Sequence, residues 1–144
     1  MLASRKPWDS YRKIAAQTAS PGQLVLMLYD GAIGFLERAL AGFDLTDPAA
    51  SIETVNNNII RAQAIINEMN GNLDMASGGE PAANFRRLYS YFHRRLREAN
   101  LRKERQPVEE TLQRFRVLRD SWAEMIRRGP EHPEPDLALQ AAAA

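Results

Sequence analysis

The sequence predicts an all-α protein, an antiparallel up-down four-helix bundle with a short N-terminal helical segment. Three observations predict this fold. Four long stretches space their apolar residues three and four positions apart, as one face of a helix requires. No stretch shows the sustained alternation of apolar and polar residues that marks a strand. The breaks between the four stretches are short, which favours antiparallel neighbours in a bundle.

The first helix begins at a run of four residues with a clear start signal. In Ser20–Gln23, the serine is placed to cap the helix, a proline takes the first helical position, and a glutamine stands where a capping box needs it. The apolar run from Leu24 to Phe43 follows directly.

The second helix repeats the cap-and-proline signal at Asp47 and Pro48, and we expect it to run to about Met75. Its apolar residues are spaced alternately by three and four, which is the heptad-type seam of a bundle. The residues of this seam are Ile52, Val55, Ile59, Ala62, Ile66, Met69 and Leu73. Two glycines in Ser77–Gly79 then favour a turn.

The third helix is expected to begin near Pro81 and to end at Arg105–Pro107, because the residue before a proline is disfavoured in the helical region. Its buried stripe is predicted to consist of Phe85, Leu88, Phe92, Leu96 and Ala99.

The fourth helix is expected from about Pro107 to Arg128. Arginines in its last turn suit the helix dipole, and Gly129 with Pro130 stops it. Its apolar positions are Val108, Leu112, Phe115, Leu118, Trp122 and Met125.

These elements divide the chain into an N-terminal cap segment (1–19), the bundle (20–128) and a flexible, proline-containing and alanine-rich tail (129–144). In the cap segment, Trp8, Tyr11, Ile14 and Ala15 fall at helical spacing. A helix this short is marginal in water, so we expect it to be ordered by docking on the bundle.

Composition argues against several functional classes. The 144 residues carry a formal charge of +1, which argues against bulk binding of nucleic acid or membrane, and they include no cysteine. We expect a cytosolic protein because no apolar run approaches the roughly 20 residues of a membrane span and the N-terminus does not read as a secretory signal. Position 90, three residues before His93, is a serine rather than the glutamate of a bundle di-metal site. We therefore expect no enzyme activity, no metal and no cofactor.

Arginine is concentrated between Arg86 and Arg105. One interpretation is a solvated helix surface. The other is a binding face for an acidic partner or RNA, and steep loss of binding with salt would be its signature.

Apolar residues exceed what a small bundle needs, because one stripe of roughly 100° suffices to join a core. Leu26, Tyr29, Ile33 and Leu40 lie away from the main stripe of the first helix. One explanation is a first helix buried on two sides, or a chain that dimerises. The other is an exposed apolar groove that receives a partner helix and is covered by the N-terminal segment when empty.

The second explanation predicts a partner-binding set drawn from the N-terminal segment and the first three helices. Its residues are Tyr11, Ile14, Leu26, Tyr29, Ile33, Ile60, Ala64 and Tyr91.

Several motifs resemble those of a known family, the flagellar secretion chaperones called FliS. The segment Thr18–Pro21 reads TASP, and Leu24–Ala32 reads LVLMLYDGA. Further matching blocks follow in the same order, over a resemblance from about Tyr11 to Met125: Ile65–Met69, Leu73 with Asp74, Gly78–Glu80, Tyr89 with Tyr91, Arg94–Leu96, Glu98–Asn100, and Leu118–Asp120 with Trp122.

The resemblance implies an antiparallel four-helix bundle that binds the C-terminal segment of flagellin in the cytosol. It also implies that the bound flagellin cannot polymerise prematurely and is delivered to the flagellar type III export gate. We expect a monomer or weak dimer that inserts into no membrane and binds no nucleic acid. A self-associating structural bundle and an arginine-rich RNA-binding bundle are the two alternatives.

Overall fold

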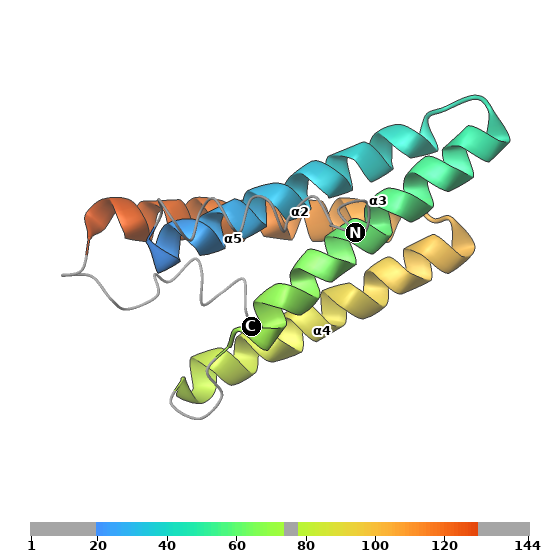
Figure 1. Ribbon diagram of the computed structural model, residues 1–144. Coiled ribbons are helices and arrows are strands. Elements are labelled where there is room, and N and C mark those ends of the chain that lie inside the picture. Colours follow the sequence, from blue (N-terminus) through green and yellow to red (C-terminus); the bar gives the residue numbers. More distant parts are fainter. Residues whose placement is uncertain (1–19, 74–77, 130–144) are drawn as a thin grey trace, which may run out of the picture.

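The computed structural model describes residues 20–73 and 78–129, which form four helices (Figure 1). They are α2 (Pro21–Phe43), α3 (Pro48–Gly71), α4 (Gly79–Arg102) and α5 (Gln106–Arg128), and the described residues contain no strand. The all-α prediction is confirmed. The N-terminal segment, with Trp8, Tyr11, Ile14 and Ala15, and the tail after Gly129 lie outside the described residues.

The two predicted helix starts with proline are confirmed in atomic detail. The backbone N–H of Gln23 donates to Oγ of Ser20 at 3.2 Å, and the N–H of Ser20 donates back to Oε1 of Gln23 at 3.1 Å. This reciprocal pair is the capping box. At the start of α3, the N–H of Ala50 donates to a carboxylate oxygen of Asp47 at 2.9 Å. Each cap satisfies N–H groups that have no partner within the helix.

Helix ends were predicted less well than helix starts. The helix α3 ends at Gly71 rather than near Met75, whereas α4 begins at Gly79, close to the expected start near Pro81. The end of α4 is set by Lys103, which adopts a left-handed conformation with φ of 53°. Pro107 lies in the first turn of α5, which confirms the predicted start of the fourth helix, and its missing N–H costs nothing there.

The four helices form a ring in which each contacts two neighbours: α2 packs on α3 and α5, and α4 packs on α3 and α5. Successive helices run antiparallel, as short connections require. Figure 1 shows that the α2/α5 pair and the α3/α4 pair lie close together near the α2–α3 and α4–α5 connections and separate toward the opposite end.

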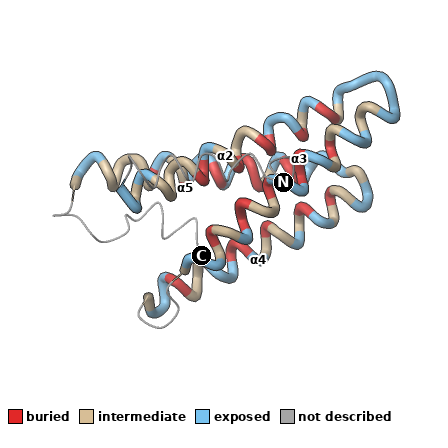
Figure 2. The backbone as a smooth tube through the Cα atoms, viewed as in Figure 1, coloured by how far each residue is buried: buried red, intermediate tan, exposed pale blue. Residues whose placement is uncertain are grey.

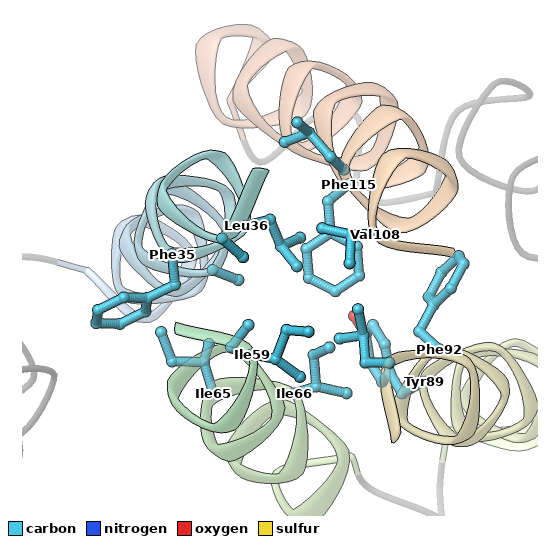
Figure 3. Close-up of a cluster of buried hydrophobic side chains, with 14 of the residues drawn as sticks. Phe35, Leu36, Ile59, Ile65, Ile66, Tyr89, Phe92, Val108 and Phe115 are labelled. Carbon is cyan, nitrogen blue, oxygen red and sulfur yellow. The ribbon is translucent and has the colours of Figure 1, made fainter. Parts of the chain in front are cut away.

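The core lies along the inner faces of all four helices (Figure 2). Leu36, Ile59 and Phe115 meet in its centre with almost no exposure, and the buried ring of Phe92 packs against Phe115 from α4 (Figure 3). From the predicted seams, Val55, Ile59, Ala62, Ile66 and Met69 of α3 are buried, and so are Leu88, Phe92, Leu96 and Ala99 of α4.

Ile52 contradicts the predicted seam, because its side chain is 54% exposed. It lies in the second turn of α3, about one turn before Val55, the first buried residue of this helix. The heptad spacing continues to Ile52, but at this end of the bundle no layer of the core includes it.

Candidate partner-binding surface

The predicted partner-binding residues lie in different places. Tyr11 and Ile14 are outside the described residues. Tyr29 is buried in the core at 1% exposure, so it offers no surface to a partner. The remaining five are accessible to different degrees: Ile60 is exposed, and Leu26, Ile33, Ala64 and Tyr91 are half-buried.

The extra apolar residues of α2 face α5. Leu26, Ile33 and Leu40 recur every seven residues, and an acidic residue follows each of them by four positions. These acidic residues, Asp30, Glu37 and Asp44, accept hydrogen bonds from Arg119, Arg116 and Arg105 at 2.8, 2.9 and 2.8 Å. The three arginines belong to α5 and to the residue just before it, so the apolar row beside the acidic residues runs along the α2/α5 seam.

Burial agrees with this placement, since Ile33 and Leu40 pack against the core cluster. The helix α2 is therefore buried on two sides, with α3 along one flank and α5 along the other. This was the simpler of the two explanations for the apolar excess. It accounts for Tyr29 and Ile33, and it removes most of the first helix from the predicted groove.

The α2/α5 ion pairs lie at the surface of the bundle. The hydrogen bond from Arg105 lowers the pKa of the Asp44 carboxyl. Exposed ion pairs contribute roughly 0–1 kcal/mol each to stability. They therefore help to set the alignment of α2 and α5 but add little to the free energy of unfolding.

The outer α3/α4 seam carries a different surface. Four polar contacts join the helices. Nδ2 of Asn100 donates to Asn56 at 2.9 Å, and Nε2 of Gln63 donates to the carbonyl of His93 at 3.0 Å. At Asn70, Nδ2 donates to Oγ of Ser90 at 3.5 Å and the carbonyl accepts from Arg86 at 3.4 Å. These contacts identify the flank that each helix turns toward the other.

Ile60 lies one turn from both Asn56 and Gln63, so it is on the α4 flank of α3, where it is 50% exposed. Ala64 lies one turn further along, and Ile52 one turn before Asn56. On α4, Arg97 lies between His93 and Asn100, and Leu101 one turn after Arg97 is 79% exposed. We call Ile52, Ile60, Ala64, Arg97 and Leu101 the α3/α4 face.

Among the described residues Arg97 makes no ion pair. Sequence reasoning missed Ile52 and Leu101 as surface residues. Leu101 carried a usable signal, since it lies off the Leu88/Phe92/Leu96 stripe. Ile52 carried none, because its spacing fits the buried seam.

Tyr91 lies on the opposite flank of α4. Its hydroxyl donates to Oε2 of Glu110 on α5 at 2.9 Å, and the same carboxylate accepts from Nε of Arg95 at 3.3 Å. Ile33, Ile60 and Tyr91 therefore belong to three different seams of the ring. A partner that touched all three would have to pass round the bundle.

The separated end of the bundle carries further half-buried apolar residues that the sequence did not single out as accessible. Trp122 is anchored there by a hydrogen bond from Nε1 to the carbonyl of Gly22 at 2.7 Å. The half-buried side chains at this end are Leu24, Val25, Met27, Leu73, Phe85, Trp122, Met125 and Ile126.

Groups that could carry chemistry are sparse in residues 20–73 and 78–129. No three of their His, Asp or Glu side chains are grouped so as to hold a metal ion. None of the four helices is long and apolar enough to cross a membrane. The surface described above is suited to contact with another polypeptide.

Comparison with known proteins gives consistent matches. The family described as flagellar protein FliS matches residues 4–129. The flagellar secretion chaperone FliS of Bacillus subtilis (strain 168) is 32% identical over 126 residues, covering 88% of this chain and 90% of that protein. The flagellar secretion chaperone FliS of Salmonella typhimurium is 37% identical over 111 residues, covering 77% and 80%. That of Escherichia coli (strain K12) is 35% identical over 112 residues, covering 78% and 80%.

Proposed function

The chain belongs to the FliS family of flagellar secretion chaperones, and from this membership we propose that its client is the C-terminal segment of flagellin. The bound segment is kept from premature polymerisation in the cytosol and is delivered to the flagellar type III export apparatus. No covalent chemistry and no cofactor are needed for this role.

The observation that carries the proposal is the α3/α4 face. Three large aliphatic side chains, Ile52, Ile60 and Leu101, are at least half exposed on two neighbouring helices. Exposed apolar groups gathered on one face favour a site for an apolar partner. The neighbouring Ala64 is small, which lets a client backbone approach α3 closely.

The energetics of the client favour an extended contact over a pocket. Fixing a disordered segment costs roughly 1–2 kcal/mol of backbone entropy per residue. Binding coupled to folding typically buries about 1,000–3,000 Å² to offset that cost. Accessible apolar residues occur at the α3/α4 face and at the separated end of the bundle, so a client that follows the bundle surface can reach both.

We also propose that the N-terminal segment covers part of this surface when flagellin is absent. Tyr11 and Ile14 would supply the apolar contacts. The free chain is then a monomer or a weak dimer, because the cover limits the apolar surface that two copies could share.

The test is to change Ile60→Ser and to measure binding to flagellin from the same bacterium by titration calorimetry. Burying an isoleucine side chain is worth roughly 1.5–3 kcal/mol, so the Kd should rise about tenfold or more. Helicity and melting temperature should stay near those of the wild type, because the side chain is half exposed before binding.

Val117→Ser is the matched control, since Val117 is also an exposed aliphatic residue but belongs to α5, away from the α3/α4 face. It should bind flagellin as the wild type does. Flagellin lacking its C-terminal segment should not bind either chain. Equal affinity of the Ile60→Ser and wild-type chains would show that the client does not use this face.

A further inference from the structure

Positive charge is concentrated on one helix. Within Gly79–Arg102, α4 carries six arginines and two glutamates, although the whole chain has a formal charge of only +1. The α4/α5 side of this helix is a second surface, separate from the α3/α4 face proposed for flagellin.

Hydrogen bonds and helical spacing place the residues of this side. Tyr91 bonds to Glu110 of α5, and Arg87 and Arg94 lie one turn before and one turn after Tyr91, so both flank α5. On α5, Arg114 lies one turn after Glu110 and faces the same way. We call Arg87, Arg94 and Arg114 the α4/α5 basic face.

The carboxylates nearby are already engaged. Arg95 lies 3.3 Å from Glu110 and 3.1 Å from Glu98, and therefore neutralises much of their charge. Arg94 reaches Glu98 only at 3.9 Å and otherwise lies over the ring of Tyr91.

The two remaining arginines have no acidic partner in the part of the chain that the structure describes. Arg87 donates to the amide oxygen of Asn84, and Arg114 makes no ion pair. The basic face therefore keeps an uncompensated positive charge.

The chain itself supplies a complementary segment. Glu131, Glu134 and Asp136 place three carboxylates within six residues, directly after Gly129 at the end of α5. Because α4 and α5 run antiparallel, this segment is attached at the end of the bundle where α4 begins. Prolines at 133 and 135 disfavour a helix and favour extended backbone in the segment.

The length of the segment determines which arginines it can contact. An extended chain spans about 3.3 Å per residue, so Glu134 can lie up to about 17 Å and Asp136 about 23 Å from Gly129. Arg114 is 15 residues before Gly129, about 22 Å along α5, which is within the reach of Asp136, and Arg87 is about 12 Å along α4 from its start, to which the crossing from α5 to α4 adds. Glu131 is only two residues from Gly129, too close along the chain to share this contact.

We propose that the acidic segment 131–136 docks on the α4/α5 basic face of its own chain and screens that face from other polyanions. Individual exposed ion pairs are weak, so the contact depends on the tether, which gives the segment a high effective concentration. The contact is consequently reversible and sensitive to salt.

The absence of cysteine in the chain allows a direct test. A nitroxide spin label on Ala141→Cys of the full chain broadens the amide NMR signals of nearby residues. In low salt, broadening should be strongest around Arg87, Arg94 and Arg114, with the reduced label as the diamagnetic reference. It should be largely lost at 1 M salt, where the Debye length is about 3 Å instead of the about 10 Å at 0.1 M salt.

Two variants of the labelled chain should remove the broadening: Glu134→Gln with Asp136→Asn, and Arg87→Gln with Arg114→Gln. The matched control is Arg61→Gln, an exposed arginine of α3, which should leave it unchanged, and thermal melts verify that each variant folds. Broadening confined to Arg127 and Arg128, broadening centred on α2 or α3, or no localised broadening would each overturn the proposal.

Discussion

Tyr29 and Tyr89 place two hydroxyl groups inside the core. The oxygens are 2.7 Å apart, although the residues are 60 positions apart in sequence and lie on α2 and α4, which are diagonal in the ring. The ring of Phe115 packs edge-on against both tyrosines, with centroids 5.6 and 6.4 Å away. One hydroxyl donates to the other, so neither buried oxygen is left without a hydrogen-bond partner.

Burial makes this pair sensitive to high pH. It raises the pKa of Tyr29 to about 12 and raises the pKa of Tyr89 well above its ordinary value. Both hydroxyls stay protonated in the folded chain while those of the unfolded chain ionise above pH 10. The free energy of unfolding should therefore be unaffected below pH 10 and should fall as the pH rises from 10 toward 12, by roughly 2–3 kcal/mol from Tyr29 alone.

Urea denaturation at several alkaline pH values measures this effect. The double change Tyr29→Phe with Tyr89→Phe removes both hydroxyls together, which is close to neutral at pH 7, and should flatten the alkaline decline. The single change Tyr89→Phe should cost about 1–3 kcal/mol at pH 7, because it leaves Tyr29 without its partner. The same alkaline decline in the double variant would assign the pH dependence to other groups.

Ile66 and Ile52 have the same place in the heptad pattern but different environments, since Ile66 is fully buried and Ile52 is half exposed. Ile66→Asp should unfold the bundle. The lost burial of roughly 1.5–3 kcal/mol and an unpaired buried carboxylate are large against a total stability of about 5–15 kcal/mol. Ile52→Asp should leave the melting temperature within a few degrees of the wild type. An unchanged melting temperature for Ile66→Asp would contradict the packing of α3.

At the scale of the helix, α2 is the element whose sequence is hardest to interpret, because it packs against neighbours on two flanks. Its α3 flank approaches closely through glycine. A Cβ at Gly31 would lie 3.1 Å from Cδ1 of Ile65, and one at Gly42 would lie 2.9 Å from Cγ2 of Thr54 and 3.1 Å from Cγ2 of Val55. Its α5 flank is the row of Leu26, Ile33 and Leu40. Ile33→Ser should therefore lower stability as well as any binding, which differs from the expectation for a residue in an open groove.

The close approach at Gly42 gives a second test of helix packing. Gly42→Ala should destabilise the chain by about 1–3 kcal/mol through overpacking against Thr54 and Val55, which exceeds the gain in helix propensity. Gly71→Ala is the matched control: no atom lies within 4 Å of its added Cβ, so it should be neutral or stabilising by up to about 1 kcal/mol. Chemical denaturation measures both, and equal effects would contradict the observed α2/α3 contact.

At the scale of the whole molecule, the ring gives each helix two covered flanks and one outer surface. The α2/α5 and α3/α4 pairs lie close together near the α2–α3 and α4–α5 connections and separate toward the other end (Figure 1). The N-terminal segment joins the bundle at Ser20, at this separated end. The proposed cover therefore begins beside the half-buried residues Leu24, Val25 and Trp122.

Removing residues 1–16 should consequently leave flagellin binding level or tighten it at low protein concentration. A cover that closes the surface most of the time lowers the apparent affinity by the fraction left open. Trp8 reports the same event, since its fluorescence should shift toward that of exposed tryptophan when flagellin is added. The Trp8→Phe chain supplies the signal of Trp122 for subtraction. A Trp8 spectrum that is solvent-like in the free chain and unchanged on binding would contradict the cover.

The sequence by itself determined the features that depend on neighbours in the chain. The caps at Ser20 and Asp47 and the buried seam from Val55 to Met69 follow from backbone hydrogen bonds and helical periodicity, which act over three or four residues. These suffice for the fold class and the number of helices, and the family motifs suffice for membership.

Only the tertiary structure decided which apolar residues off the seams are accessible. Ile33 and Ile60 have similar patterns, but Ile33 is covered by α5 while Ile60 lies at an outer seam. The burial of Tyr29 likewise depends on Tyr89 and Phe115, and the exposure of Ile52 depends on where the core ends. The burial of each of these side chains depends on contacts with helices that are distant in the sequence. The spacing of apolar residues along one helix does not show which neighbouring helix will cover them.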